Sequence, residues 1–377
     1  MNPFDSPRLA WQKLRPLILL AAVVALAWFL LESLVFRTGF YYRNLAQPSS
    51  NAGTTVMNLR LARRLASISP PTILVFGDSR VGQGFSPDIA HRTEPSLNFI
   101  NVAVPGSMPR TWYYLLRAME RKGVHFDAIV VGNLYPMMGA AHWADWSLDL
   151  NFLVPMVDLR DAMSFPQSFD APASRERANF AVWLPALAMQ KDIQDLLGSP
   201  RERRRALRGK QWWLENIRNY RSRDEVMPSL NFSPTREVLD WANATADQRG
   251  SVEQHLRVLE QAPADNDAYA RIWYGKLLEL ARRHQAPLIL YPLPRGPFAA
   301  ILPTEDVLPA WLTELANEPD VEVLPADLLK DLEAPDYFFD ALHANRLGQE
   351  ITSERVARAV ARRIGKTITA PAQVTEP

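Results

Sequence analysis

Cysteine is absent from this chain of 377 residues, and histidine is scarce, with six in all. Without cysteine, the chain can form neither disulfides nor thiolate metal sites. No two histidines have the spacing of a metal-binding motif such as H-E-x-x-H, so we expect no metal and no other cofactor. Neither sign of charge dominates, since the formal net charge is +1. This balance gives no electrostatic reason to expect nucleic acid as a partner.

One long apolar run is present near the N-terminus, between Pro16 and Phe36. It is about as long as the roughly 20 residues of helix that cross a bilayer. Basic residues precede it, so the positive-inside rule keeps residues 1–15 in the cytoplasm. A cleaved signal peptide is the alternative, but the run ends in a Leu-Val-Phe-Arg sequence, which is a poor cleavage site. We therefore expect an uncleaved single-pass anchor over 16–36, with the chain after about residue 40 outside the cytoplasm.

Strands and helices alternate on both sides of a central segment. Apolar runs rich in β-branched residues predict strands over 72–76, 97–104, 128–132, 287–291 and 321–324. Such alternation is typical of a parallel sheet covered by helices on both faces. We predict an α/β fold, a three-layer sandwich with about five parallel strands, formed by residues 71–136 and 267–365.

Three segments lie outside this alternation. Residues 37–70 are predicted to be a juxtamembrane linker with one short basic helix, and residues 366–377 a disordered tail. Residues 137–266 contain six of the eleven tryptophans and predict a mostly helical insertion, or cap, beside the active-site edge of the sheet. The basic run over 201–205 in this insertion is either a solvated helix face or a contact for a membrane surface or a partner.

Two short polar motifs carry the candidate chemistry. Ser79 follows the strand predicted over 72–76, which places it at the carboxyl end of a buried strand, where ligands collect in open α/β sheets. Asp340 and His343 are three residues apart near the end of the chain. A serine, a histidine and an aspartate are the side chains that nucleophilic acyl transfer needs. We expect Ser79 to be the nucleophile, His343 its general base, and Asp340 the carboxylate that orients the histidine.

The oxyanion of a tetrahedral intermediate needs hydrogen-bond donors aimed at it. The candidates are the backbone N–H of Ser79, the backbone N–H of Gly106 after the second strand, and the side-chain amide of Asn133 after the third. The alternative for Gly106 is an ordinary Pro-Gly turn, and for Asn133 a cap of the strand end. Arg80, beside the nucleophile, either contacts an anionic substrate or is simply solvated.

In this order the motifs resemble the four blocks of the SGNH (GDSL-type) hydrolase superfamily. The matching residues are Gly77-Asp78-Ser79, Gly106, Asn133 and Asp340-x-x-His343. The resemblance covers roughly residues 70–135 and 285–364, and it implies a flavodoxin-like three-layer sandwich. The third block departs from the family pattern, since Leu134 follows Asn133 where the family usually has Asp.

The resemblance also implies a function, because membrane-anchored members work beside membrane-bound O-acyltransferases. These members include the alginate and cellulose O-acetylation accessories and the D-alanine transfer protein of teichoic acids. It therefore implies a periplasmic catalytic domain on a bacterial inner membrane, an acyl-Ser79 intermediate, an envelope polysaccharide as acceptor, and an O-acyltransferase partner. Water as the acceptor would make the same site an esterase. The other possibilities are a non-catalytic module that binds a glycan or a partner, and an esterase of membrane lipids.

Overall fold

The computed structural model describes residues 6–133, 142–145, 148–216, 241–261, 265–302 and 308–369. The described strands form one all-parallel sheet in the order β2-β1-β3-β4-β5. The strands are β1 (Thr72–Phe76), β2 (Asn98–Asn101), β3 (Ala128–Asn133), β4 (Leu288–Pro292) and β5 (Val321–Val323). The predicted α/β class with about five parallel strands is confirmed.

Side chains of β1 alternate between the two faces of the sheet, and both faces are buried. Ile73 and Val75 pack on one face, while Leu74 and Phe76 pack on the other. A parallel strand covered on both sides needs an unbroken apolar run, and this is why the sequence of β1 shows no polar alternation.

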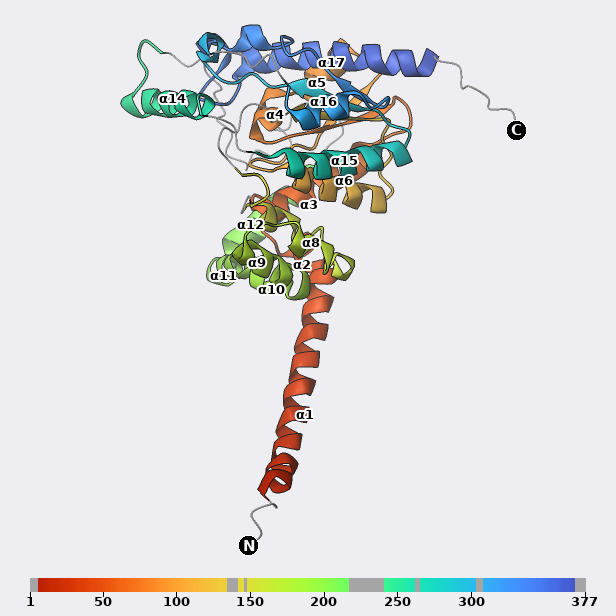
Figure 1. Ribbon diagram of the computed structural model, residues 1–377, viewed down its shortest axis with the longest axis vertical. Helices are drawn as coiled ribbons and strands as arrows, with labels where there is room; N and C mark the ends of the chain where they lie inside the picture. Colours follow the sequence, from red (N-terminus) through yellow and green to blue (C-terminus); the bar gives the residue numbers. More distant parts are fainter. Residues whose placement is uncertain are drawn as a thin grey trace, which may run out of the picture.

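Helices cover both faces of the sheet (Figure 1). On one face lie α4 (Ser79–Gly84), α5 (Pro87–Thr93) and α17 (Arg346–Thr369). On the other lie α3 (Asn51–Leu65), α6 (Pro109–Arg121), α15 (Asp267–Arg283) and α16 (Ala310–Ala316). Because α17 extends to Thr369, the predicted tail begins as helix, and residues 370–377 lie outside the described residues.

The segment 37–70, which we expected to be a linker, is instead packed into the core. It contains α2 (Phe40–Asn44) and α3, and α3 buries a face that includes Val56 and Leu61. The side-chain amide of Asn58, also buried, donates to the carbonyls of Val102 and Ala103 at 2.9 and 3.0 Å. The buried face of α3 consists largely of small and polar residues, so hydropathy alone did not reveal it.

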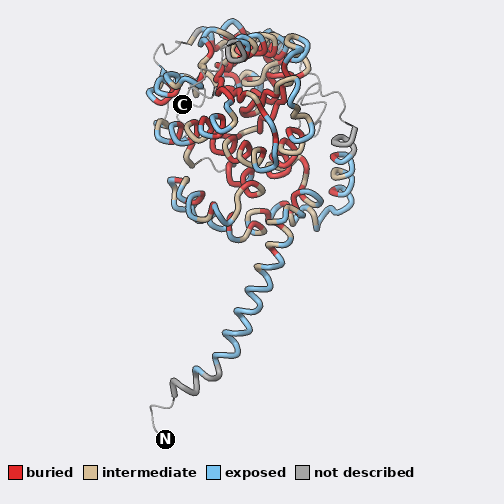
Figure 2. The backbone as a smooth tube through the Cα atoms, turned by 90° about the vertical axis from the view of Figure 1, so that its right-hand side faces the viewer, coloured by how far each residue is buried: buried red, intermediate tan, exposed pale blue. Residues whose placement is uncertain are grey.

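One helix extends away from the rest of the molecule (Figures 1 and 2). α1 (Ser6–Glu32) continues into a π-helical turn over Ser33–Arg37. Within the described residues, the segment Leu14–Arg37 alone is long and apolar enough to cross a membrane, with a mean hydropathy of 2.5 over its most apolar stretch, and its residues before Glu32 are almost all exposed. An exposed apolar helix of this length fits a lipid environment far better than water.

The end of α1 is fixed to the helices of the insertion. The Glu32 carboxylate accepts a hydrogen bond of 2.8 Å from the backbone N–H of Ala186. The Arg37 guanidinium donates to the carbonyls of Val182 and Trp183 at 2.8 and 3.0 Å. The direction of α1 is therefore set by side-chain contacts at its base.

The insertion divides into two regions that lie in different places (Figure 1). The first gathers around α2 near the base of α1 and contains α7 (Leu148–Leu153), α8 (Ser164–Gln167), α9 (Pro172–Trp183), α10 (Pro185–Ala188), α11 (Gln190–Gly198) and α12 (Pro200–Asn216). In this region the buried Asp192 carboxylate accepts from Tyr41 of α2 and pairs with Arg203 of α12. The second region, α14 (Ala246–Leu259), packs against Ala341 between Asp340 and His343, where we had expected the insertion as a whole.

Candidate active site

Ser79 is held at the carboxyl end of β1 by a tight turn. The Asp78 side chain caps α4 by accepting from the backbone N–H of Arg80 at 2.9 Å, so α4 begins at Ser79. Val81 of α4 packs directly on two glycines: a Cβ atom at Gly77 would lie 2.2 Å from the Val81 Cγ2 atom, and one at Gly132 would lie 2.3 Å from it. The glycine before Asp78 is therefore required by close packing of α4 on β1 and β3.

Asp340 and His343 are joined by a compact turn. The Asp340 Oδ1 atom accepts from the backbone N–H groups of Leu342 and His343 at 2.8 and 2.7 Å. Around this turn, Phe338 and Ala344 form an antiparallel bridge. The spacing of three residues thus brings the second carboxylate oxygen of Asp340 to the His343 ring.

The three side chains form a continuous hydrogen-bonded chain. The His343 Nδ1 atom lies 2.8 Å from the Asp340 Oδ2 atom, and the His343 Nε2 atom lies 2.8 Å from the Ser79 Oγ atom. An ionised carboxylate can only accept, so the Nδ1 atom carries the ring proton and the Nε2 atom is left to accept from the Ser79 hydroxyl. This is the protonation state that a general base needs before it takes a proton from serine.

The electrostatics of Asp340 fit this role. Burial alone would raise the pKa of its carboxyl group, but hydrogen bonds from the His343 ring and from the two backbone N–H groups hold that pKa below its ordinary value. Asp340 is therefore ionised at neutral pH, and a carboxylate in this position can stabilise a protonated His343 ring.

Contacts of α17 hold the two motifs together. The buried Gln349 side chain donates to the carbonyl of Gln83 in α4 at 2.6 Å, and the Ser353 hydroxyl accepts from the backbone N–H of Ser86 at 2.8 Å. The Asn345 side chain caps α17 by accepting from the N–H of Gly348 at 3.0 Å. The helix that follows the catalytic turn is thus fastened to the helix that begins with Ser79.

The predicted oxyanion donors lie on neighbouring loops and strand ends. Gly106 has a left-handed backbone, with φ of 69°, in the loop after β2. That loop is joined to the turn before Ser79, because the N–H of Val104 donates to the carbonyl of Gly77 at 2.9 Å. Asn133 is the last residue of β3 and pairs with Pro292 of β4, but its side chain lies outside the described residues.

Arg80 lies against Asp78 rather than extending into solvent. Its Nε atom is 3.1 and 3.0 Å from the two carboxylate oxygens of Asp78, and its side chain is only 7% exposed. This buried ion pair stiffens the turn that presents Ser79. It is a contact that neither sequence interpretation of Arg80 had included.

His255 is a neighbour of the site that the sequence analysis did not identify. Its Nε2 atom donates to the carbonyl of Arg295 at 2.6 Å. Burial lowers the pKa of His255, and so do the charges of Arg80 and His343, whereas the charge of Asp340 acts to raise it. No local pattern marks His255, because α14 reaches the site only through the tertiary fold.

The carbonyl that His255 contacts belongs to a rigid loop after β4. The buried Arg295 guanidinium pairs with the Glu333 carboxylate at 2.7 Å and donates to the carbonyl of Ala299 at 2.8 Å. In the same loop, a Cβ atom at Gly296 would lie 2.8 Å from the carbonyl oxygen of Ala341 and 3.0 Å from the His255 ring. α14 and the catalytic turn therefore meet across Gly296.

The arrangement can activate a hydroxyl nucleophile and return its proton to a leaving group. In the part of the chain that the structure describes, no cluster of three or more His, Asp or Glu side chains is placed to hold a metal ion. Comparison with protein-family models gives no match, and comparison with curated proteins gives none either.

Proposed function

We propose that this chain is an SGNH-type serine acyltransferase or esterase that acts outside the cytoplasm on O-acyl groups of an envelope glycan. The observation that supports it is the hydrogen-bonded chain from Ser79 through His343 to Asp340. A binding module without catalysis has no need of a histidine held by a carboxylate on one side and aimed at a serine hydroxyl on the other.

The reaction proceeds in two balanced halves. The Ser79 oxygen attacks the donor's acyl carbonyl while His343 takes the hydroxyl proton, and the leaving alcohol then departs with that proton. In the second half, His343 takes a proton from the acceptor hydroxyl, which attacks the acyl-Ser79 ester, and Ser79 recovers its proton. A sugar hydroxyl as acceptor gives transfer, and water gives hydrolysis.

The oxyanion donors in this proposal are the N–H groups of Ser79 and Gly106 and the Asn133 amide. Ser79 is the first residue of α4, so no carbonyl of that helix can accept a hydrogen bond from its backbone N–H. Each well-placed donor lowers the barrier by about 3 kcal/mol. Arg80 acts here by holding Asp78, and only secondarily through contact with substrate.

The proposed location rests on α1 and on the positive-inside rule. The basic residues that precede its apolar part keep the N-terminus in the cytoplasm of a bacterial cell, which puts the α/β layers in the periplasm. In Figure 1, α14 and α4 lie in the upper part of the molecule with the α/β layers, whereas α1 leaves from its lower end. This placement favours an envelope glycan over a membrane lipid as the acceptor, and it leaves the membrane face for an O-acyltransferase partner.

A comparison in cells tests the proposal. Full-length wild type, Ser79→Ala and Ser251→Ala are expressed in a bacterium that lacks its own copy, and ester-linked acyl groups released from the envelope are measured. Ser251 is an exposed serine of α14 and serves as the matched control. We expect the wild type and Ser251→Ala to change the amount of released acyl groups relative to cells without the protein. Ser79→Ala should leave that amount unchanged, although it is present in the membrane in equal amount. Full activity of Ser79→Ala would refute the enzymatic proposal.

A further inference from the structure

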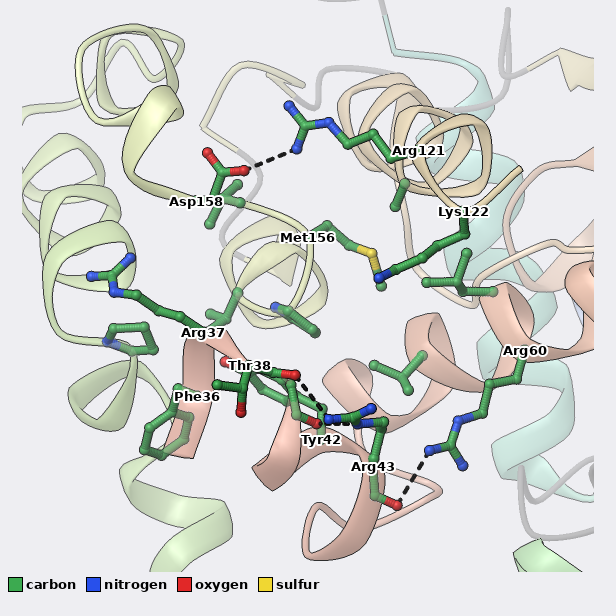
Figure 3. Close-up of a pocket in the computed structure, with 18 of the residues that line it drawn as sticks. Phe36, Arg37, Thr38, Tyr42, Arg43, Arg60, Arg121, Lys122, Met156 and Asp158 are labelled. Carbon is green, nitrogen blue, oxygen red and sulfur yellow. Dashed lines mark hydrogen bonds and ion pairs between the residues drawn. The ribbon is translucent and has the colours of Figure 1, made fainter. Parts of the chain in front are cut away.

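A cavity of about 350 Å³ lies at the base of the molecule, away from Ser79 (Figure 3). It opens where the apolar segment Leu14–Arg37 ends, between the Ser33–Arg37 turn, α2, α3, α6 and residues 154–158. Its volume is within the usual range of small-molecule sites. Apolar side chains that include Val56, Leu59 and Met156 line much of it.

The charged residues around this cavity are almost all of one sign. Its lining contains the cations Arg37, Arg43, Arg60, Arg63, Arg121 and Lys122, but only one carboxylate, that of Asp158. Asp158 is already paired with Arg121 at 3.0 Å. A concentration of cations this unbalanced stands out in a chain whose net charge is +1.

Besides Arg121, two of these arginines have structural partners. Arg37 donates to carbonyls of the insertion, and the Arg43 guanidinium donates to the Thr38 carbonyl at 3.0 Å. By contrast, within the described residues neither Arg63 nor Lys122 has an acidic partner, and Arg60 makes only a long contact of 3.5 Å with a carbonyl. These three cations are therefore not needed to hold the surrounding elements in place.

Among the described residues, positive charge without a paired carboxylate is also found on the half-buried Arg60 and the buried Lys210. Burial, together with the charges of Arg43 and Arg63, lowers the pKa of Arg60. Lys210 of α12 is 5% exposed, its amine has no hydrogen-bond partner among the described residues, and burial and the charge of Arg60 lower its pKa to about 8. Cations held close together in this way repel one another, and a bound anion would relieve the repulsion.

We propose that this cavity binds the phosphate headgroup of an anionic phospholipid from the membrane leaflet next to the end of α1. The phosphate contacts Arg60, Arg63 and Lys122, and the apolar lining receives the glycerol and the first methylenes of the acyl chains. Both parts of the site match such a lipid, since a free phosphate would leave the apolar lining unused and a neutral lipid would leave the cations uncompensated. The inference rests on α1 being in a membrane and not on the chemistry of Ser79.

Native mass spectrometry of the full-length protein in a neutral detergent tests this site. The protein is titrated with dioctanoyl phosphatidylglycerol, with dioctanoyl phosphatidylcholine, and with glycerol 3-phosphate as the free headgroup. We expect the anionic lipid to bind at least about tenfold more tightly than the zwitterionic lipid or the free headgroup, because only it satisfies both halves of the site.

The double variant Arg60→Gln/Arg63→Gln should weaken binding of the anionic lipid by about 25-fold, the effect of removing two cations near a membrane surface. The matched control, Arg204→Gln/Arg205→Gln, removes two exposed cations of α12 and should leave the affinity unchanged. The charge-preserving variant Arg60→Lys/Arg63→Lys should retain most of it. The thermal midpoint of the double variant should equal or exceed that of the wild type, because the variant loses repulsion.

Equal affinity for the two lipids would overturn the proposal. So would an equal loss of affinity for the anionic lipid in the double variant and in its control. Binding of glycerol 3-phosphate as tight as that of the lipid would make the cavity a site for small anions. Unchanged lipid affinity in the double variant, with loss of a co-purified membrane protein, would make it a protein-docking surface instead.

Discussion

The side-chain amide of Gln349 donates a hydrogen bond of 2.6 Å to the backbone carbonyl of Gln83, and both residues are buried. The bond joins α17 to α4, and so it joins the helix after His343 to the helix that starts with Ser79. Its importance is positional, since the distance between the His343 Nε2 and Ser79 Oγ atoms depends on how these two helices meet.

Gln349→Ala should therefore impair the reaction more than its effect on folding alone would explain. Leaving the Gln83 carbonyl unsatisfied costs about 1–3 kcal/mol of unfolding free energy, and a displaced base should lower kcat about tenfold or more with little change in KM. Gln190→Ala, at an exposed position, is the control. Denaturant unfolding and ester-hydrolysis kinetics measure the two effects, and an unchanged kcat would show that the bond has no part in positioning.

Asp340→Asn removes the negative charge but keeps the size of the side chain. An amide at this position can donate to the His343 ring and stabilise the wrong tautomer, in which the Nε2 atom carries the proton and cannot accept from Ser79. We expect kcat to fall by about 10³- to 10⁴-fold while KM stays within a few-fold. Loss of less than tenfold would mean that Asp340 does not orient the base.

The depressed pKa of Asp340 also predicts how stability depends on pH. Since the folded-state pKa lies below the ordinary value of 3.8, the folded protein binds fewer protons here than the unfolded chain. The stabilisation is fully present above the ordinary pKa and is lost as the pH falls through the folded-state pKa. The difference in unfolding free energy between wild type and Asp340→Asn should therefore be constant near neutral pH and shrink below about pH 4. A difference that grows on acidification would have the wrong sign.

Gly296 offers a test of the contact between α14 and the catalytic turn. Its φ of 134° is rare for residues with a side chain, and an added Cβ atom would lie 2.8 Å from the Ala341 carbonyl oxygen. Gly296→Ala should destabilise the protein by about 1–3 kcal/mol and lower activity by displacing the turn that carries His343. Both effects are measured by thermal unfolding and ester hydrolysis.

Gly250→Ala is the matched control on α14 itself. Beyond the backbone of its own helix, no atom lies within 4 Å of a Cβ at this position, so this variant should gain about 0.5–1 kcal/mol of stability. If both variants behave alike, the close approach at Gly296 is not what holds α14 at the site.

The sequence predicted those features that depend on local pattern. The apolar run of β1 and the Gly-Asp-Ser motif predicted that Ser79 lies at a strand end. The order of the motifs predicted that Asp340 and His343 lie at the same edge of the sheet. β2 ends at Asn101 and is shorter than predicted, although the N–H groups of Val102 and Val104 still donate to the carbonyls of Val75 and Gly77.

The features that were missed depend on tertiary contacts. The segment 37–70 looked polar, but α3 buries small and polar side chains such as that of Asn58, which contacts the loop after β2. His255 is far from the catalytic motifs in sequence, and only the fold brings α14 beside Ala341. Arg80 could not be assigned from sequence, because its partner Asp78 is equally able to face solvent.

Intact-mass spectrometry of the full-length protein, after exposure to activated acetyl and longer acyl esters, tests the central claim most directly. The account predicts one acyl increment on the wild type, located at Ser79 by peptide mapping, and no increment on Ser79→Ala. An acceptor sugar or water should then discharge it, which also distinguishes transfer from hydrolysis. A folded wild-type protein that acquires no adduct from any donor, or an adduct that persists in Ser79→Ala, would contradict the account.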